Sequence, residues 1–194
     1  MSKSPYKYPG NSPGKEAGRT NAYARLSKHD FYTKQHIVIA GDCGDIHYLI
    51  RQGVTPSNIW AFDIDPKCTE QAYHLGVSVA EDDLSLGIVG GVKYVCDMGY
   101  DIASINVDLC MSMINGLPIL KQVYDLIGVS NTHLFFTFLC GHDAGLRKQT
   151  WEHNPGEKRL AYFKEKMGRG LYDYYTYQSW SKTTTGSPMC MGYL

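Results

Sequence analysis

The chain has 194 residues, the usual size of one domain and enough to bury a hydrophobic core without disulfides or metals. Hydrophobic residues make up 43% of it and charged residues 20%, as in ordinary globular proteins, and the formal net charge is zero. No overall electrostatic field therefore selects nucleic acid or a membrane as the partner.

The six cysteines are irregularly spaced, and no two of them form a C-x-x-C pair. This spacing argues against a disulfide framework or a zinc ribbon and favours a reducing compartment. The amino-terminal residues lack the apolar core of a signal peptide, and no apolar run approaches the roughly 18 residues that span a bilayer. The sequence thus predicts a cytoplasmic protein with no membrane partner and no metal site.

Residues 1–35 differ in composition from the rest of the chain. They are rich in Pro, Gly, Ser and Lys, and their seven basic residues oppose only two acidic ones. Such a segment buries too little apolar surface to offset the entropy of ordering. We predict a basic, partly disordered amino-terminal arm at 1–35 and one folded domain at 36–194. The arm is either a solvated tail or a segment that contacts the phosphates of DNA or RNA or covers a substrate.

From residue 36 the hydrophobic pattern alternates between strands and helices. In the first half it predicts strands at 36–41, 58–65 and 77–83, with helices at 45–53 and 66–76 between them. Residues 84–99 fit either a helix weakened by glycines or a loop with a short strand.

The second half predicts strands at 100–110 and 132–141, helices at 114–128 and 156–168, and two closing strands at about 171–180 and 187–193. Alternating strands and helices require a mainly parallel sheet with right-handed crossovers. The predicted fold is therefore α/β: a Rossmann-like, doubly wound, mainly parallel sheet with an antiparallel C-terminal strand pair.

In such sheets, ligands bind beyond the carboxyl ends of the strands. The first strand is followed by Gly41, Asp42 and Gly44, which let a ligand approach the backbone, although turns of this kind are often purely structural. Asp63 ends the second strand about twenty residues later, where an acid suits the ribose hydroxyls of a nucleoside. Capping of the next helix is the alternative role, and we assign Asp63 to the ribose and Asp65 to the cap.

Three further strand ends offer polar side chains. The acids at 81–83 either accept a hydrogen bond from an adenine amino group or form a solvated turn. Asn106 and Asp108 lie on one face of the fourth strand, where Asp108 acts either as a general base or as a buried structural acid. Cys110 is a candidate nucleophile or, more simply, a buried thiol, and His142 is a candidate substrate or acid–base residue after the fifth strand.

The run IVIAGDCGD…IWAFDIDPKC…VAEDD…YDIASINVDL resembles the nucleotide-binding half of the class I S-adenosylmethionine-dependent methyltransferases, over roughly residues 36–140. The resemblance implies that Asp63 holds the cofactor ribose, that Asp82 contacts adenine, and that the turn from Gly41 to Gly44 cradles the methionine end. The chain departs from the family at Ala40, where an acid is usual, with Asp42 as a substitute from a shifted position.

Family members that methylate amino groups of nucleic-acid bases place Asn or Asp, two prolines and an aromatic residue after the fourth strand. Here Asn106-Val107-Asp108-Leu109 keeps the polar residues without the prolines or the aromatic residue. We therefore expect an S-adenosylmethionine-dependent methyltransferase, with Asn106 and Asp108 as catalytic residues and nucleic acid as the favoured substrate. A catalytically inactive binding or assembly protein is the alternative. An NAD-dependent enzyme is a third reading, against which the sparse glycines count.

Overall fold

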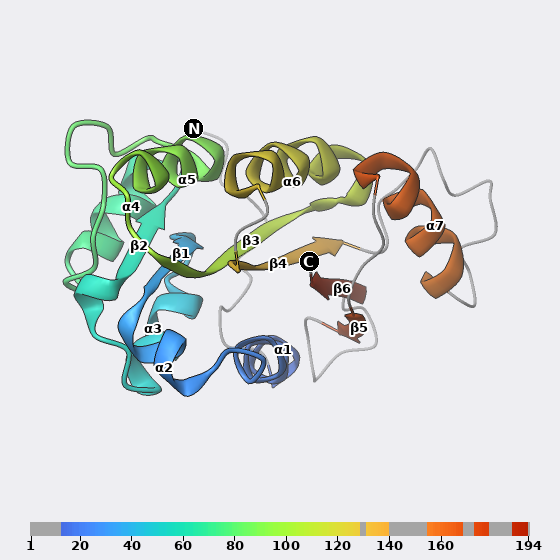
Figure 1. Ribbon diagram of the computed structural model, residues 1–194, viewed down its shortest axis with the longest axis horizontal. Coiled ribbons are helices and arrows are strands. Elements are labelled where there is room, and N and C mark those ends of the chain that lie inside the picture. Colours follow the sequence, from blue (N-terminus) through green and yellow to red (C-terminus); the bar gives the residue numbers. More distant parts are fainter. Residues whose placement is uncertain (1–12, 129–130, 140–154, 169–172, 179–187, 194) are drawn as a thin grey trace.

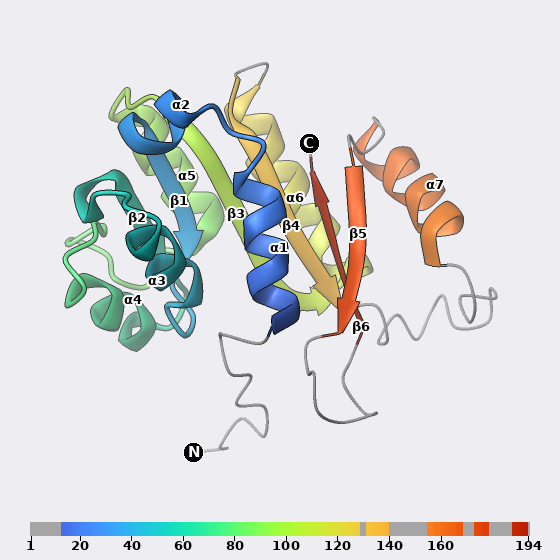
Figure 2. The same cartoon turned by 90° about the horizontal axis from the view of Figure 1, so that it is seen from below.

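The computed structural model describes residues 13–128, 131–139, 155–168, 173–178 and 188–193. Its strands are β1 (Gln35–Ile39), β2 (Ile59–Phe62), β3 (Ile102–Ser112), β4 (His133–Leu139), β5 (Asp173–Gln178) and β6 (Pro188–Tyr193). They form one sheet in the order β2-β1-β3-β4-β6-β5 (Figures 1 and 2). The first four are parallel, and β6 is antiparallel to both β4 and β5. This confirms the predicted fold class and the antiparallel closing pair.

Helices cover both faces of the sheet (Figure 1). One face carries α1 (Pro13–Tyr23), α2 (Lys28–Thr33), α3 (Gly44–Arg51) and α4 (Pro66–Tyr73), and the other carries α5 (Ile88–Asp97), α6 (Met113–Ile127) and α7 (Pro155–Met167). None of these helices combines the length and the hydropathy that a membrane-spanning segment needs, as far as the described residues go.

Strand alternation divides the core into two clusters. In β1, Val38 packs in the cluster beneath α1–α4, whereas Ile37 packs in the cluster beneath α5–α7. In β3 the second cluster receives Ile105 and Val107. The opposite face of β3 therefore turns the polar side chain of Asn106 towards α1, where it is buried.

The third predicted strand is reduced to a single bridge between Ser78 and Trp60 of β2. The apolar part of this segment, residues 77–80, is short, and the acids at 81–83 are exposed. Pairing more of the segment with β2 would therefore bury little additional apolar surface. The uncertain segment at 84–99 contains the helix α5. Gly91 allows this helix to lie against Phe62, whose ring occupies the place of a β-carbon.

Within the predicted partly disordered arm at 1–35, the structure describes the helices α1 and α2 between residues 13 and 33. Four apolar side chains of this segment join the same core cluster as Val38: Ala22, Tyr23, Leu26 and Phe31. Composition underestimated this segment because these few buried side chains anchor it to the sheet. Residues 1–12 lie outside the described part of the chain.

Candidate functional site

A strained turn joins β1 to α3 at the carboxyl edge of the sheet. Gly41 has φ +44°, and Cys43, which is fully buried, has φ +61°. The Cys43 N–H donates to the Ala40 carbonyl at 2.7 Å, and the Gly44 N–H donates to Asp42 Oδ1 at 3.2 Å. A left-handed backbone is uncommon for a residue with a β-carbon, and such strain concentrates at functional sites.

Asp63 ties the ends of β1 and β2 together. Its Oδ2 accepts from the Gly41 N–H at 2.9 Å, and its Oδ1 accepts from the Asp65 N–H at 2.9 Å. Asp65 caps α4 by accepting from the Lys67 N–H at 3.0 Å, as predicted. Each oxygen of the half-buried Asp63 carboxylate keeps a further lone pair for a ligand hydroxyl.

The two predicted catalytic residues lie at the same edge. Asn106 pairs in register with Val38 of β1, which is one residue from the end of that strand. Asp108 therefore lies just beyond the end of β1, beside Thr137 of β4. Asn106 and Asp108, which the sequence placed on the fourth predicted strand, thus lie on β3 at the side of the sheet where this fold binds ligands.

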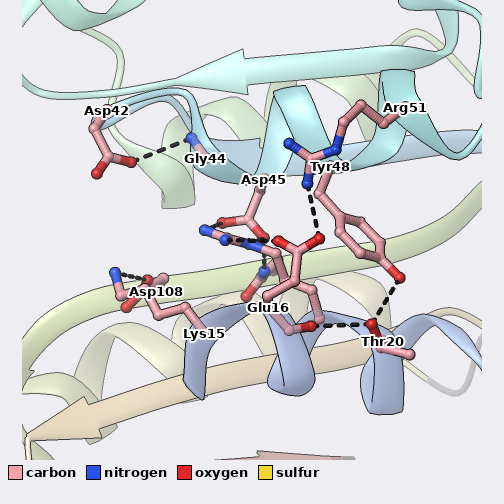
Figure 3. A network of polar contacts seen from close by, with 11 residues as sticks. Lys15, Glu16, Thr20, Asp42, Gly44, Asp45, Tyr48, Arg51 and Asp108 are labelled. Carbon is pink, nitrogen blue, oxygen red and sulfur yellow. Dashed lines mark hydrogen bonds and ion pairs between the residues drawn. The ribbon is translucent and has the colours of Figure 1, made fainter. Parts of the chain in front are cut away.

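Both residues are connected to α1: Asn106 through Asp45, and Asp108 through Lys15, which Figure 3 shows beside it. Arg19 donates through Nε to Asp45 Oδ1 at 2.9 Å, and Asn106 donates through Nδ2 to the same oxygen at 2.8 Å. Burial alone would lower the pKa of the Arg19 guanidinium, but the charge and hydrogen bond of Asp45 outweigh it and raise that pKa. Arg19 and Asp45 therefore form a buried, charged hydrogen-bonded pair.

Asp108 has its own partner on α1. Lys15 Nζ lies 2.9 Å from Asp108 Oδ2, and the two side chains are 9% and 16% exposed. Lys15 and Arg19 are four residues apart, so they project from one face of the helix. One face of α1 thus supplies two cations: Arg19 pairs with Asp45, and Lys15 pairs with Asp108.

An outer layer of contacts surrounds these pairs. Arg51 donates to Glu16 at 2.8 Å, and the Thr20 hydroxyl donates to the Glu16 carbonyl at 3.0 Å. Burial raises the pKa of the Tyr23 phenol well above its ordinary value, and the charge of Asp45 adds to that rise. The Tyr23 hydroxyl lies next to Asn106 and makes no hydrogen bond of good geometry to the described residues.

The remaining predicted residues are less informative. Asp82 is exposed in the loop after the Ser78 bridge, and its neighbour Asp83 holds the turn by accepting from Ser85. His142 and the side chain of Cys110 lie outside the described residues. Among the residues that are described, no group of three or more His, Cys, Asp or Glu side chains could hold a metal ion.

Sequence reasoning missed Lys15, Arg19 and Asp45 as site residues. Sequence analysis gives none of the three a partner in the site, because Asp45 begins the helix predicted at 45–53 and the two cations fall in the predicted amino-terminal arm. Their four-residue spacing was a usable signal for one helix face. Nothing in the sequence showed that this face packs on a strand that lies 93 residues away at Asp108.

A separate hollow of about 310 Å³ lies at the opposite edge of the sheet. Its lining includes Lys34, Asp101, Ile102 and Thr132, which precede or begin β1, β3 and β4. It is thus at the amino ends of the strands and contains none of the predicted site residues.

A SAM-dependent methyltransferase from Leishmania major has a similar structure, with a TM-score of 0.56, 10% sequence identity, and coverage of 96% of this chain and 78% of that chain. An rRNA methylase from Streptococcus thermophilus is 13% identical over 91% of this chain and 93% of that chain, but its TM-score of 0.49 is too low to carry a conclusion. Neither a family model nor a curated protein sequence matches the chain. The likeness shows the fold alone: that of a class I S-adenosylmethionine-dependent methyltransferase, as the resemblance in sequence implied.

Proposed function

We propose that the chain is an S-adenosylmethionine-dependent methyltransferase whose cofactor binds at the carboxyl ends of β1 and β2. The observation that carries the proposal is the Asp63 carboxylate, held between the Gly41 and Asp65 amides at the edge where this fold binds ligands. A carboxylate fixed in this way can accept both hydroxyl hydrogens of a ribose.

The neighbouring residues fit the rest of such a cofactor. Ile64, next to Asp63, is 81% exposed and offers an apolar surface for a purine base. Gly41 has open space where a β-carbon would be, so a ligand can approach the backbone there. We assign Asp82 to the adenine amino group and the turn from Gly41 to Gly44, with Asp42, to the methionine end.

Bound S-adenosylmethionine would supply the methyl group that is transferred. Methyl transfer is an in-line displacement, so the protein mainly has to align the acceptor with that group. Asn106 and Asp108 face the same side of β3 and are proposed to orient the acceptor. The Asp108 carboxylate can take up the proton that methylation releases. A polar hydrogen of the acceptor would compete with the Lys15 ammonium for this carboxylate.

Nucleic acid is the proposed acceptor class. Asn106 is buried beneath α1, so the partly exposed Asp108 next to it is the group that would meet a base. The amino-terminal segment gives this proposal less support than its composition suggests. Lys15, Arg19 and Lys34 contact carboxylates of the protein itself. The contribution of that segment to phosphate binding therefore rests on its other four basic residues: Lys3, Lys7, Arg25 and Lys28.

An inactive binding protein is the second candidate function. The observation that favours it is the Lys15–Asp108 ion pair, which neutralises the proposed acceptor-side acid from within the protein. Detection of methyl transfer to any acceptor would exclude this candidate.

Calorimetric titration with S-adenosylhomocysteine tests the cofactor assignment. We expect the unaltered chain to bind it and Asp63→Asn to weaken binding by about 1–3 kcal/mol, because one charged acceptor is lost from the ribose site. Asp97→Asn is the matched control, since Asp97 is an exposed acid on α5 that pairs with Lys93.

Melting curves without ligand separate loss of affinity from loss of folding, since Asp63 also accepts two backbone hydrogen bonds. An Asp63→Asn variant that stays folded and keeps full affinity would remove Asp63 from the cofactor site. Binding of NAD in place of S-adenosylhomocysteine would overturn the proposed cofactor.

A further inference from the structure

The contact between α1 and the carboxyl edge of the sheet is made by charged side chains. Counted over the whole residue, Lys15 is 7% exposed and Arg19 is 3% exposed, and each contacts a carboxylate. The helix already has apolar anchors in Ala22 and Tyr23, which belong to the core cluster beneath it. Docking of α1 alone therefore does not explain why two cations are buried beside the site.

The arrangement around Asp45 links α1 to Asn106. Asp45 Oδ1 accepts from Arg19 Nε and from Asn106 Nδ2, and Arg19 Nη2 lies 3.5 Å from Asp45 Oδ2. The planar guanidinium thus faces both oxygens and fixes the tilt of the carboxylate. Because Asp45 can only accept, it binds the NH2 end of the Asn106 amide, so the carbonyl end must point elsewhere.

We infer that Arg19 is a positioning residue: through Asp45 it sets the orientation of the buried Asn106 side-chain amide, which lies on the same face of β3 as Asp108. This inference rests on the proposed function, in which the acceptor meets Asp108 beside Asn106. Without the guanidinium, the Asp45 carboxylate loses the partner that holds it, and the Asn106 amide loses its fixed hydrogen-bond acceptor.

A role in folding alone explains the pair less well. A buried ion pair contributes little net stability compared with apolar side chains of similar volume, because both charges must be desolvated. What the pair does supply is a defined geometry, since both donors converge on one oxygen. That geometry ends on a residue of the proposed site.

The test measures the Asn106 side-chain amide directly by ¹H–¹⁵N NMR, with the two NH2 signals assigned by their loss in Asn106→Asp. We expect these signals to shift and broaden in Arg19→Met. In Arg19→Lys, which keeps the charge but not the planar fork, they should shift less. Arg51→Met is the matched control, because Arg51 pairs with Glu16 of the same helix at an exposed position and touches neither Asp45 nor Asn106; its spectrum should keep the Asn106 signals in place.

A lower melting temperature in Arg19→Met with unchanged Asn106 signals would overturn the inference, because Arg19 would then only hold α1 in place. If Arg19→Met does not fold, Arg19→Lys decides: Asn106 signals identical to those of the unaltered chain would overturn it equally. These signals do not depend on catalysis or on a bound ligand.

Methyl transfer from radiolabelled S-adenosylmethionine to bulk RNA and DNA gives a second readout. Arg19→Met should lower kcat by about 100-fold through misplacement of the acceptor, with an unchanged KM for the methyl donor. A raised KM at unchanged kcat would instead place Arg19 in the cofactor site and overturn the inference. Failure of the unaltered chain to bind S-adenosylhomocysteine would reject the proposed function, and the NMR result would still show whether Arg19 orients Asn106.

Discussion

At the scale of single residues, Gly41 combines a left-handed backbone with a hydrogen bond from its N–H to Asp63. We predict that Gly41→Ala lowers the free energy of unfolding by roughly 1–2 kcal/mol, because alanine resists positive φ. It should also weaken binding of S-adenosylhomocysteine, because the turn meets the cofactor. Chemical denaturation and calorimetry measure the two effects.

Gly99→Ala is the control for Gly41→Ala. Gly99 has φ +76° and open space at its β-carbon, but it follows α5 away from the proposed site. It should lose a similar amount of stability and keep full affinity. Equal losses of affinity in the two variants would show that the effect of Gly41→Ala is general and not local.

His36 connects the amino-terminal segment to the sheet. Its Nε2 faces the Phe31 carbonyl at 2.9 Å and therefore carries the hydrogen, while Nδ1 accepts from the Ser104 hydroxyl at 2.7 Å. Burial lowers the pKa of His36, although the Phe31 carbonyl partly opposes this. The folded protein thus holds the imidazole neutral at a pH where the unfolded chain protonates it.

The sign of the pH dependence follows from this difference in protonation. The stabilisation is complete above the ordinary histidine pKa of about 6.5 and is lost as the pH falls below it, because the unfolded state then binds more protons. We predict that His36→Gln flattens the dependence of the unfolding free energy on pH below about 6.5. An unchanged slope in His36→Gln would contradict the account.

Sequence reasoning succeeded at the residue scale where partners are close in the chain. Asp65 could be assigned to the helix cap because its partner is Lys67. Asp45 could not be assigned, because its partners Arg19 and Asn106 are 26 and 61 residues away. Such contacts depend on how elements pack, which no local pattern specifies.

At the scale of elements, α5 shows how glycine in a helix is used for packing. A β-carbon at Gly91 would overlap the ring of Phe62, whereas one at Gly90 would meet only the flexible end of Leu86. We predict that Gly91→Ala destabilises the fold by about 1–3 kcal/mol through overpacking. Gly90→Ala should cost less or even stabilise, because alanine favours the helix by about 1 kcal/mol. Thermal and chemical unfolding of both variants check this, and equal effects would contradict it.

The strands and most helices could be predicted because their hydrophobic periodicity is clear. The two errors have opposite causes. The strand at 77–83 has the right composition, but only Ser78 bridges to β2, and no further strand among the described residues lies beside it. The helix α1 has the composition of a loop, yet it is held by Tyr23 in the core and by ion pairs at its amino-terminal end.

At the scale of the whole molecule, the two ends of the parallel strands carry different features. The turn between β1 and α3 lies at the carboxyl ends, and a hollow lies at the amino ends. The carboxyl edge holds Asp63, Asn106 and Asp108 together with Lys15 and Arg19 of α1. Figure 3 shows Lys15 beside Asp108. The amino edge holds the hollow of about 310 Å³ near Asp101 and Thr132. The topology favours the carboxyl edge for the ligand.

One measurement tests this assignment most directly: titration of S-adenosylhomocysteine into ¹⁵N-labelled protein, followed by backbone amide NMR. The account predicts that the largest shifts occur at Gly41, Gly44 and the segment 63–65, at the carboxyl ends of β1 and β2. Shifts centred on Tyr100, Asp101 and Thr132 would place the ligand at the opposite edge and contradict the account, as would the absence of any shift at saturating ligand.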